Sequence, residues 1–237
     1  MREHFAASFG VLAFSCAIQA ADVTIEFPDG SISTIHGRAT PRPRLVDEDG
    51  APLWSIYVEL RELAVRGDAS AAWALGIALQ HCGTPPREKA FCAGITESQA
   101  ATGEEWTRRA ALAGYPPASM HYASRLKFSN DALRYLEIAW NDGQFLAANN
   151  LAAWYERGSA GERKPDPVKA LAFSFIADGI TRHRLAGATT TLRITTREMS
   201  AEAHARRLAA ASEEQRSEAI ALARKLLQEN PNCCYGF

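Results

Sequence analysis

The stretch AANNLAAWYERG, residues 147–158, carries the pattern that decides the fold. The alanine at its start is followed after four positions by the large apolar Leu151, after five by the small Ala152 and after eight by Tyr155, and a glycine closes the stretch. These offsets place the residues on one face of an α-helix. The stretch therefore predicts a helix whose buried face combines bulky residues with small ones.

The same offsets occur in two earlier copies. They are Ala71, Leu75, Gly76, Leu79 and Cys82 in the first copy, and Ala118, Tyr122, Ala123, Leu126 and Ser129 in the second. A further apolar helical pattern precedes each of the three copies and ends at Gly67, Gly114 or Gly143, where a chain leaving a helix takes a positive φ that favours glycine. Repeated helix pairs predict a stack in which each pair covers the apolar face that its neighbour leaves bare.

This pattern resembles the Sel-one-like repeat family, relatives of the tetratricopeptide repeats, whose hallmark is Leu-Gly-x-x-Tyr-x-x-Gly followed by Asp-x-x-Lys-Ala. The third copy is most similar, with Leu151 to Gly158 followed by Asp166, Lys169 and Ala170. Alanine replaces glycine in two of the Leu-Gly slots, and the repeat spacing is uneven. The resemblance covers roughly residues 55–230 and includes a closing helix capped by Ser212. It implies an all-α, tetratricopeptide-like solenoid of stacked antiparallel helix pairs, with a repeat domain over 51–230.

The chain before the repeats divides into two parts. Residues 1–20 predict a secretory signal peptide, because Arg2 precedes an uncharged apolar run too short to cross a bilayer and Ala20 supplies a small residue for cleavage. A lipoprotein acylated at Cys16 is the alternative. Residues 21–50 predict a short β-hairpin that turns at Pro28-Asp29-Gly30 and then a proline-rich linker. We expect this second part to be an accessory to the repeats in an exported, periplasmic or secreted protein.

Removing the signal leaves an even number of cysteines, which in an oxidising compartment predicts disulfides. The first choice is Cys82 with Cys92, which would clip a loop that contains glycine and prolines. Cys233 and Cys234, in the tail over 231–237, could form a vicinal disulfide, pair with another chain or stay reduced. The paired-ligand spacing of a zinc site is absent from the sequence, so we expect no metal.

Composition and motifs argue against several functions. The 26 basic and 27 acidic side chains leave no strong field of either sign, so nucleic acid is not an expected partner. The sequence holds no nucleophile elbow, no His-Glu-x-x-His and no phosphate loop. Ser124 and Lys127 match Ser-x-x-Lys without its companion motifs, and the histidines are scattered singly. The sequence therefore predicts neither an enzyme nor a cofactor.

The repeat slots also sort the large aromatic residues. Trp106, Trp140 and Tyr155 occupy slots that face the core, so packing explains them. Trp73 and Trp154 fall outside these slots, which makes them candidates for contact with a partner.

Solenoids of this class bind through the concave surface that the first helix of each pair lines, and the repeat positions allow that surface to be projected. The projected set is Trp73, Ile77, Gln80 and His81 in the first copy, Met120, Ser124 and Lys127 in the second, and Asn149, Ala153, Glu156 and Arg157 in the third. Its mixture of apolar and polar residues suits a protein or peptide segment. We therefore expect an exported scaffold or adaptor without a membrane span in its mature chain. The alternatives are a module that binds cell-wall glycan or peptide, and a hydrolase of the cysteine-rich-repeat type.

Overall fold

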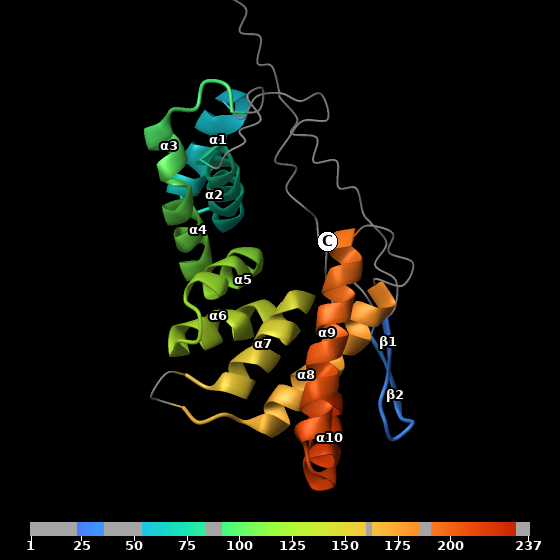
Figure 1. Ribbon diagram of the computed structural model, residues 1–237. Helices are drawn as coiled ribbons and strands as arrows, with labels where there is room; N and C mark the ends of the chain where they lie inside the picture. Colours follow the sequence, from blue (N-terminus) through green and yellow to red (C-terminus); the bar gives the residue numbers. More distant parts are fainter. Residues whose placement is uncertain (1–22, 36–53, 84–91, 160–162, 185–190, 231–237) are drawn as a thin grey trace, which may run out of the picture.

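The computed structural model describes residues 23–35, 54–83, 92–159, 163–184 and 191–230, and this part of the chain is mostly helical (Figure 1). The helices are α1 (Trp54–Val65), α2 (Ala69–Gly83), α3 (Glu97–Ala101), α4 (Gly103–Leu112), α5 (Pro116–Arg125), α6 (Asn130–Asn141), α7 (Phe145–Arg157), α8 (Pro167–Arg184), α9 (Thr191–Ala210) and α10 (Glu213–Glu229). The predicted signal peptide, the proline-rich linker and the pair Cys233 and Cys234 lie outside the described residues.

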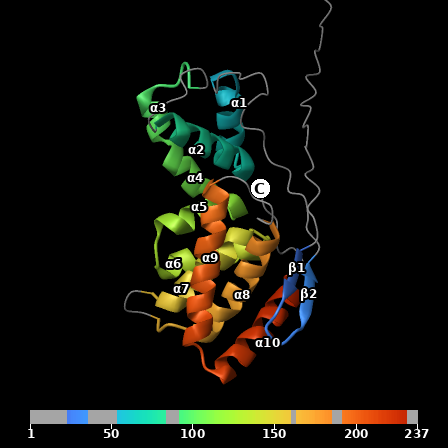
Figure 2. The same ribbon diagram turned by 45° about the vertical axis from the view of Figure 1, so that its right-hand side comes forward.

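The helices pack mainly against their neighbours in the chain. In order, α1 packs on α2, α2 on α4, α4 on α5, α5 on α6, α6 on α7 and α7 on α8. The order changes at α8, which also packs against α9, α10 and β1. Figures 1 and 2 both place α1 to α4 at one end of the molecule and α8 to α10 at the other.

The predicted hairpin is confirmed. Strand β1 (Val23–Glu26) pairs antiparallel with β2 (Ile32–Ile35), with Glu26 opposite Ile32. The backbone N–H of Gly30 donates to the carbonyl oxygen of Phe27 at 2.9 Å, and Gly30 adopts a φ of 77°. A positive φ at this point is why the turn takes glycine.

The hairpin contributes more to the core than an accessory would. Ile25 and Phe27 are 1% and 2% exposed, and the ring of Phe27 meets the ring of Phe175 on α8 edge to face at 6.0 Å. Gly179 on α8 lies directly beneath Ile25, because a Cβ at Gly179 would come within 2.8 Å of the isoleucine side chain. The strand therefore covers one side of α8.

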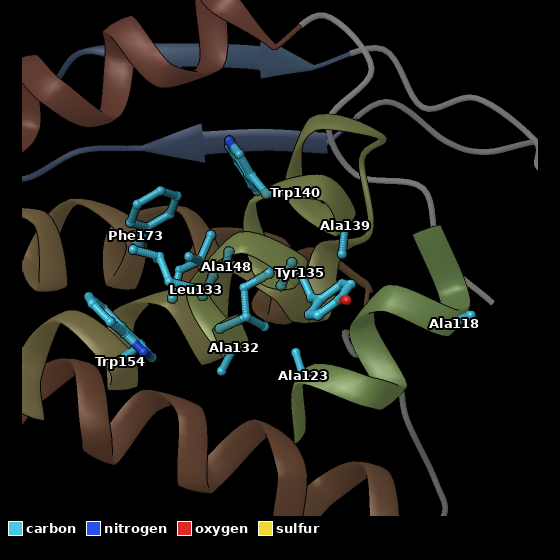
Figure 3. Close-up of a cluster of buried hydrophobic side chains, with 14 of the residues drawn as sticks. Ala118, Ala123, Ala132, Leu133, Tyr135, Ala139, Trp140, Ala148, Trp154 and Phe173 are labelled. Carbon is cyan, nitrogen blue, oxygen red and sulfur yellow. The ribbon is translucent and has the colours of Figure 1, made fainter. Parts of the chain in front are cut away.

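The repeat slots form the core that the sequence predicts. Figure 3 shows part of this cluster, where residues of α5, α6, α7 and α8 converge. Slot residues of the first and third copies are buried, as in Leu75 and Leu151, and so are Trp106, Trp140 and Tyr155. The predicted positive φ is present at Gly67, Gly114 and Gly143.

Trp154, which the repeat pattern made a candidate for contact with a partner, belongs to the core instead. It is 1% exposed, and its indole N–H donates to the carbonyl oxygen of Ser129 at 3.1 Å. The prediction that Trp154 contacts a partner is therefore wrong. A buried indole N–H needs an acceptor, and the segment between α5 and α6 provides one.

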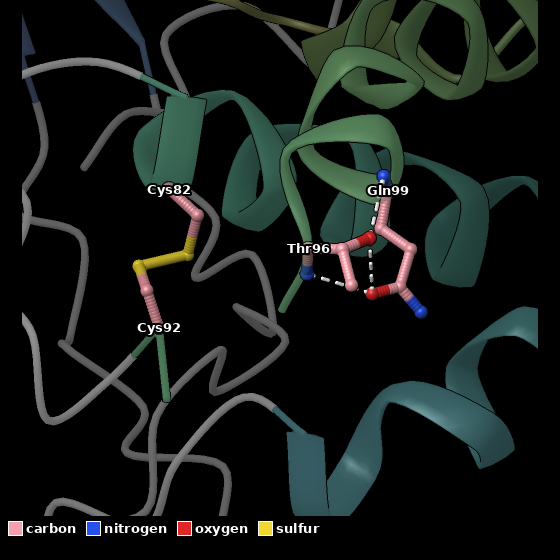
Figure 4. The surroundings of a disulfide bond; sticks show 4 residues. All are labelled: Cys82, Cys92, Thr96 and Gln99. Carbon is pink, nitrogen blue, oxygen red and sulfur yellow. Dashed lines mark hydrogen bonds between the residues drawn. A yellow bond between two sulfur atoms is a disulfide. The ribbon is translucent and has the colours of Figure 1, made fainter. Parts of the chain in front are cut away.

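The predicted disulfide joins Cys82, near the end of α2, to Cys92 (Figure 4). The two Cα atoms lie 5.5 Å apart, and Cys82 is 2% exposed. Shortly after Cys92, the Thr96 side chain caps α3 in a capping box with Gln99. A disulfide in this position fits an oxidising environment outside the cytoplasm. Within the described ranges, no helix is both long and apolar enough to cross a lipid bilayer.

Candidate interaction surface

A few side-chain contacts join α2 to α5, α5 to α7 and α7 to α9, and we call these four helices the inner helices. The ring of Trp73 on α2 meets His121 on α5 edge to face at 5.5 Å. One turn further along, Arg125 of α5 donates to the side-chain oxygen of Gln80 at 3.5 Å. Between α5 and α7, the Asn150 amide donates to the sulfur of Met120 at 3.7 Å. These contacts link α2, α5 and α7 in chain order.

The contacts between α7 and α9 continue this series. The Ser200 hydroxyl donates to the Asn149 side-chain oxygen at 3.4 Å, and Arg207 donates to the Glu156 carboxylate at 2.7 Å. Both pairs join residues 51 positions apart in the chain. An equal separation at two points along the helices means that α7 and α9 run in the same direction.

None of the eleven projected partner residues is buried. Trp73, Ile77, Gln80, Met120, Asn149 and Ala153 are half-buried, whereas His81, Ser124, Lys127, Glu156 and Arg157 are exposed. The structure brings Trp73, Gln80 and Met120 into the contacts between inner helices described above. It places Arg157 with its guanidinium 4.6 Å from the ring centre of Phe128. The role of these residues in binding stays a prediction.

Two details differ from the projection. Asn149 and Glu156 already contact the protein's own α9, so they are not wholly available to a partner. Lys127 does not lie on a helix, because α5 ends at Arg125 and Lys127 adopts a φ of 54°. The reason is local: the Ser129 side chain caps α6 by accepting from the Ala132 N–H, so the chain must leave α5 before that residue.

Sequence reasoning missed His121, Arg125 and Arg207 as residues of the inner helices. The i to i+4 spacing of His121 and Arg125 on α5 was the signal available, but a single histidine in a helix carries little information. Arg207 is more buried than a charged side chain usually is. Its side chain is 10% exposed and also donates to the Ser174 hydroxyl on α8 at 3.4 Å.

The pKa values of two histidines of the inner helices, His121 on α5 and His204 on α9, are shifted so that the neutral form is favoured. Burial lowers the pKa of His121, with a further lowering by Arg125 and an opposing effect of Glu104. Burial also lowers the pKa of His204 on α9, where Arg182 and Arg207 act in the same direction and Asp178 opposes them. The His204 ring lies 3.0 Å from the Ser174 hydroxyl through Nδ1 and packs on the ring of Phe175 at 4.9 Å.

The Ser-x-x-Lys match, formed by Ser124 and Lys127, can be judged from the hydrogen bond that the serine makes. The Ser124 hydroxyl donates to the backbone carbonyl oxygen of His121 in its own helix at 2.6 Å. In the described part of the chain, no group of three or more histidine, cysteine, aspartate or glutamate side chains is arranged to hold a metal ion.

Comparison of the chain with protein-family models, with curated proteins and with solved structures finds no significant match.

Proposed function

We propose that this protein is an exported scaffold or adaptor of the Sel-one-like, tetratricopeptide-like type. In this proposal the helices form a short solenoid of antiparallel pairs, and α2, α5 and α7 present a surface that binds a segment of another protein in the bacterial periplasm or envelope.

The observation that carries the proposal is the ordered series of contacts between inner helices. Trp73 with His121, Met120 with Asn150, and Glu156 with Arg207 join α2 to α5, α5 to α7 and α7 to α9. Stacked repeats generate such a series because equivalent helices of successive repeats are neighbours in space. The surface they share is extended, as binding of a peptide or protein segment requires.

The composition of this surface supports a protein partner. Half-buried Trp73, Ile77 and Met120 offer apolar area near α2 and α5, and the exposed Ser124 and Arg125 add polar groups beside them. Apolar anchors surrounded by polar residues are typical of surfaces that bind proteins. The disulfide between Cys82 and Cys92 supports an oxidising, exported location.

The proposal is tested by affinity capture of the tagged protein from intact, crosslinked cells. We expect Ser124→Trp to abolish capture of a specific envelope protein, because it places a bulky ring on the exposed inner side of α5. Trp73→Ala should weaken capture by removing an apolar anchor. Circular dichroism of each variant checks that the helices remain.

The matched control is Arg134→Trp, which adds the same ring at an exposed position of α6, a helix outside the inner set. This variant should capture the same protein as the wild type. Equal loss in Ser124→Trp and Arg134→Trp would contradict the assignment of the surface. Capture of cell-wall fragments in place of a protein would favour the glycan-binding alternative.

A further inference from the structure

Helix α1 is the first helix of the packed stack and lies against α2. It leaves several apolar side chains exposed to solvent. One side of the helix packs on α2 and includes the buried Tyr57 and Ala64. On a neighbouring side, Trp54, Val58 and Val65 are 46%, 55% and 64% exposed. With about 3.6 residues per turn, these three positions fall within a narrow stripe along α1. We call Trp54, Val58 and Val65 the α1 stripe.

One residue of the α1 stripe, Trp54, packs against side chains and backbone behind it. The Trp54 ring stacks on the Tyr57 ring with centres 5.5 Å apart and planes 13° from parallel. Gly94, which follows the disulfide, also lies against Trp54, because a Cβ there would come within 3.2 Å of the indole. An apolar surface that is fixed before binding loses little conformational entropy when a partner covers it.

Two opposite charges flank the α1 stripe. Arg61 and Glu62 are both exposed, and neither forms an ion pair with another described residue. Successive residues of a helix are about 100° apart, so Arg61 lies along one edge of the stripe and Glu62 along the other. The stripe is therefore positive on one edge and negative on the other at the same height along α1.

This arrangement is complementary to itself in one orientation. When two copies of α1 pair in parallel about a twofold axis, the Arg61 edge of one helix meets the Glu62 edge of the other, twice. An antiparallel pair would instead bring each edge against the same edge of its copy, and like charges would face each other. We propose that the α1 stripe is the contact of a homodimer in which two α1 helices pair in parallel.

The pairing brings Val58 and Val65 against their counterparts, with Trp54 at one end and the two ion pairs beside them. A single pair of helices of this length buries less than the roughly 1,200 Å² of a standard stable interface. We therefore expect a reversible dimer that forms with increasing concentration. The inference does not rest on the proposed function, because the stripe lies outside the projected partner residues.

The test is analytical ultracentrifugation of the whole chain over a range of concentrations. The wild type should dimerise. Arg61→Glu and Glu62→Arg should each weaken the dimer by about tenfold or more, because each places like charges in contact at both symmetric positions. The double variant Arg61→Glu/Glu62→Arg restores opposite charges and should recover an affinity close to that of the wild type.

Arg134→Glu on α6 is the control for a charge reversal elsewhere on the surface and should leave the dimer unchanged. A wild type that stays monomeric at all concentrations would overturn the proposal. A segment of the same chain would then be the candidate to cover the α1 stripe. A double variant as weak as the single variants would overturn the parallel pairing. Circular dichroism of each variant separates a lost contact from a lost fold.

Discussion

Helices α2 and α8 are each packed between several neighbours, but they achieve this in different ways. Helix α2 approaches α4 at two glycines: a Cβ at Gly76 would lie 2.7 Å from the backbone nitrogen of Thr107, and one at Gly103 would lie 2.7 Å from that of Gln80. Every residue of α8 from Ala170 to Thr181 is buried, and the large side chains of Phe175 and Ile176 are among them.

The difference lies in what each helix can tolerate. At α2 the backbones themselves are in contact, so added volume is the main threat. At α8 the strand β1 also approaches a glycine, Gly179, but large buried side chains such as Phe175 and Ile176 fill much of the contact with the other neighbours, so lost volume is the main threat there. The region around α2 combines the close approach of its backbone to α4 with the disulfide at Cys82. The region around α8 relies on a large buried apolar area.

Phe27→Ala should produce the largest loss of stability. The ring is buried against Phe175, and truncation of a buried phenylalanine costs about 3 to 5 kcal/mol. Urea denaturation followed by circular dichroism measures the loss. Ile32→Ala on the same hairpin is the control, because Ile32 is 64% exposed and its truncation should change stability by less than about 0.5 kcal/mol. Similar values for the two variants would show that the hairpin is not docked on α8.

Gly76→Ala should destabilise the other region by about 2 to 3 kcal/mol, because the new methyl group meets the backbone of α4. The same denaturation experiment applies. Gly83→Ala serves as its control, since a Cβ at Gly83 meets only the Cβ of Ala100 at 3.9 Å, an ordinary contact. A Gly76→Ala protein as stable as the wild type would mean that α2 and α4 are further apart.

Acidification should loosen the contact between α8 and α9. Because burial lowers the pKa of His204 in the folded protein below its ordinary value of 6.5, protonation favours the unfolded form. The contribution of His204 to stability is therefore present above pH 6.5 and is lost as the pH falls below it. Hydrogen exchange measured by mass spectrometry, with each rate divided by the intrinsic rate at the same pH, should show lower protection of α8 and α9 at lower pH.

His204→Gln keeps a polar group facing Ser174 and removes the titration, so it should abolish this pH response in α8 and α9. The pKa of His121 is also lowered, so exchange in α2 and α5 should respond to acid in both proteins. A pH response of α9 that survives in His204→Gln would exclude His204 as its source.

Lys127→Gly should give the smallest effect and the opposite sign. Lys127 adopts a left-handed φ of 54°, which glycine takes without steric cost. We expect a gain of about 0.5 to 1 kcal/mol in the free energy of unfolding, because relief of the roughly 1 to 2 kcal/mol left-handed penalty outweighs the greater freedom of glycine in the unfolded chain. Lys127→Ala is the control, because alanine carries the same Cβ as lysine and should give no gain.

Features that depend on neighbouring residues in the sequence were predictable. The offsets around Leu75 and Leu151 define helix faces, and the positive φ at Gly67 follows from the end of a helix. The cap at Ser212 and the clip between Cys82 and Cys92 are also short-range signals. Each of these depends on residues within one or two helical turns or within one loop.

Features that depend on distant segments were not predictable. Trp154 is buried because a carbonyl oxygen at Ser129 accepts its N–H, and no periodicity within α7 encodes that partner. The docking of Ile25 on Gly179 joins opposite ends of the chain. The contact of Glu156 with Arg207 likewise required knowing where α9 lies. Such contacts arise from tertiary packing, which a single sequence does not display.

Binding of a protein by the inner helices can be observed in intact cells by placing a photoreactive amino acid at Ser124 on the inner side of α5, or at the exposed Arg134 on α6, and irradiating. We expect a defined crosslinked protein from position 124 and none from position 134. The same product from both positions, or a product from position 134 alone, would contradict binding by the inner helices.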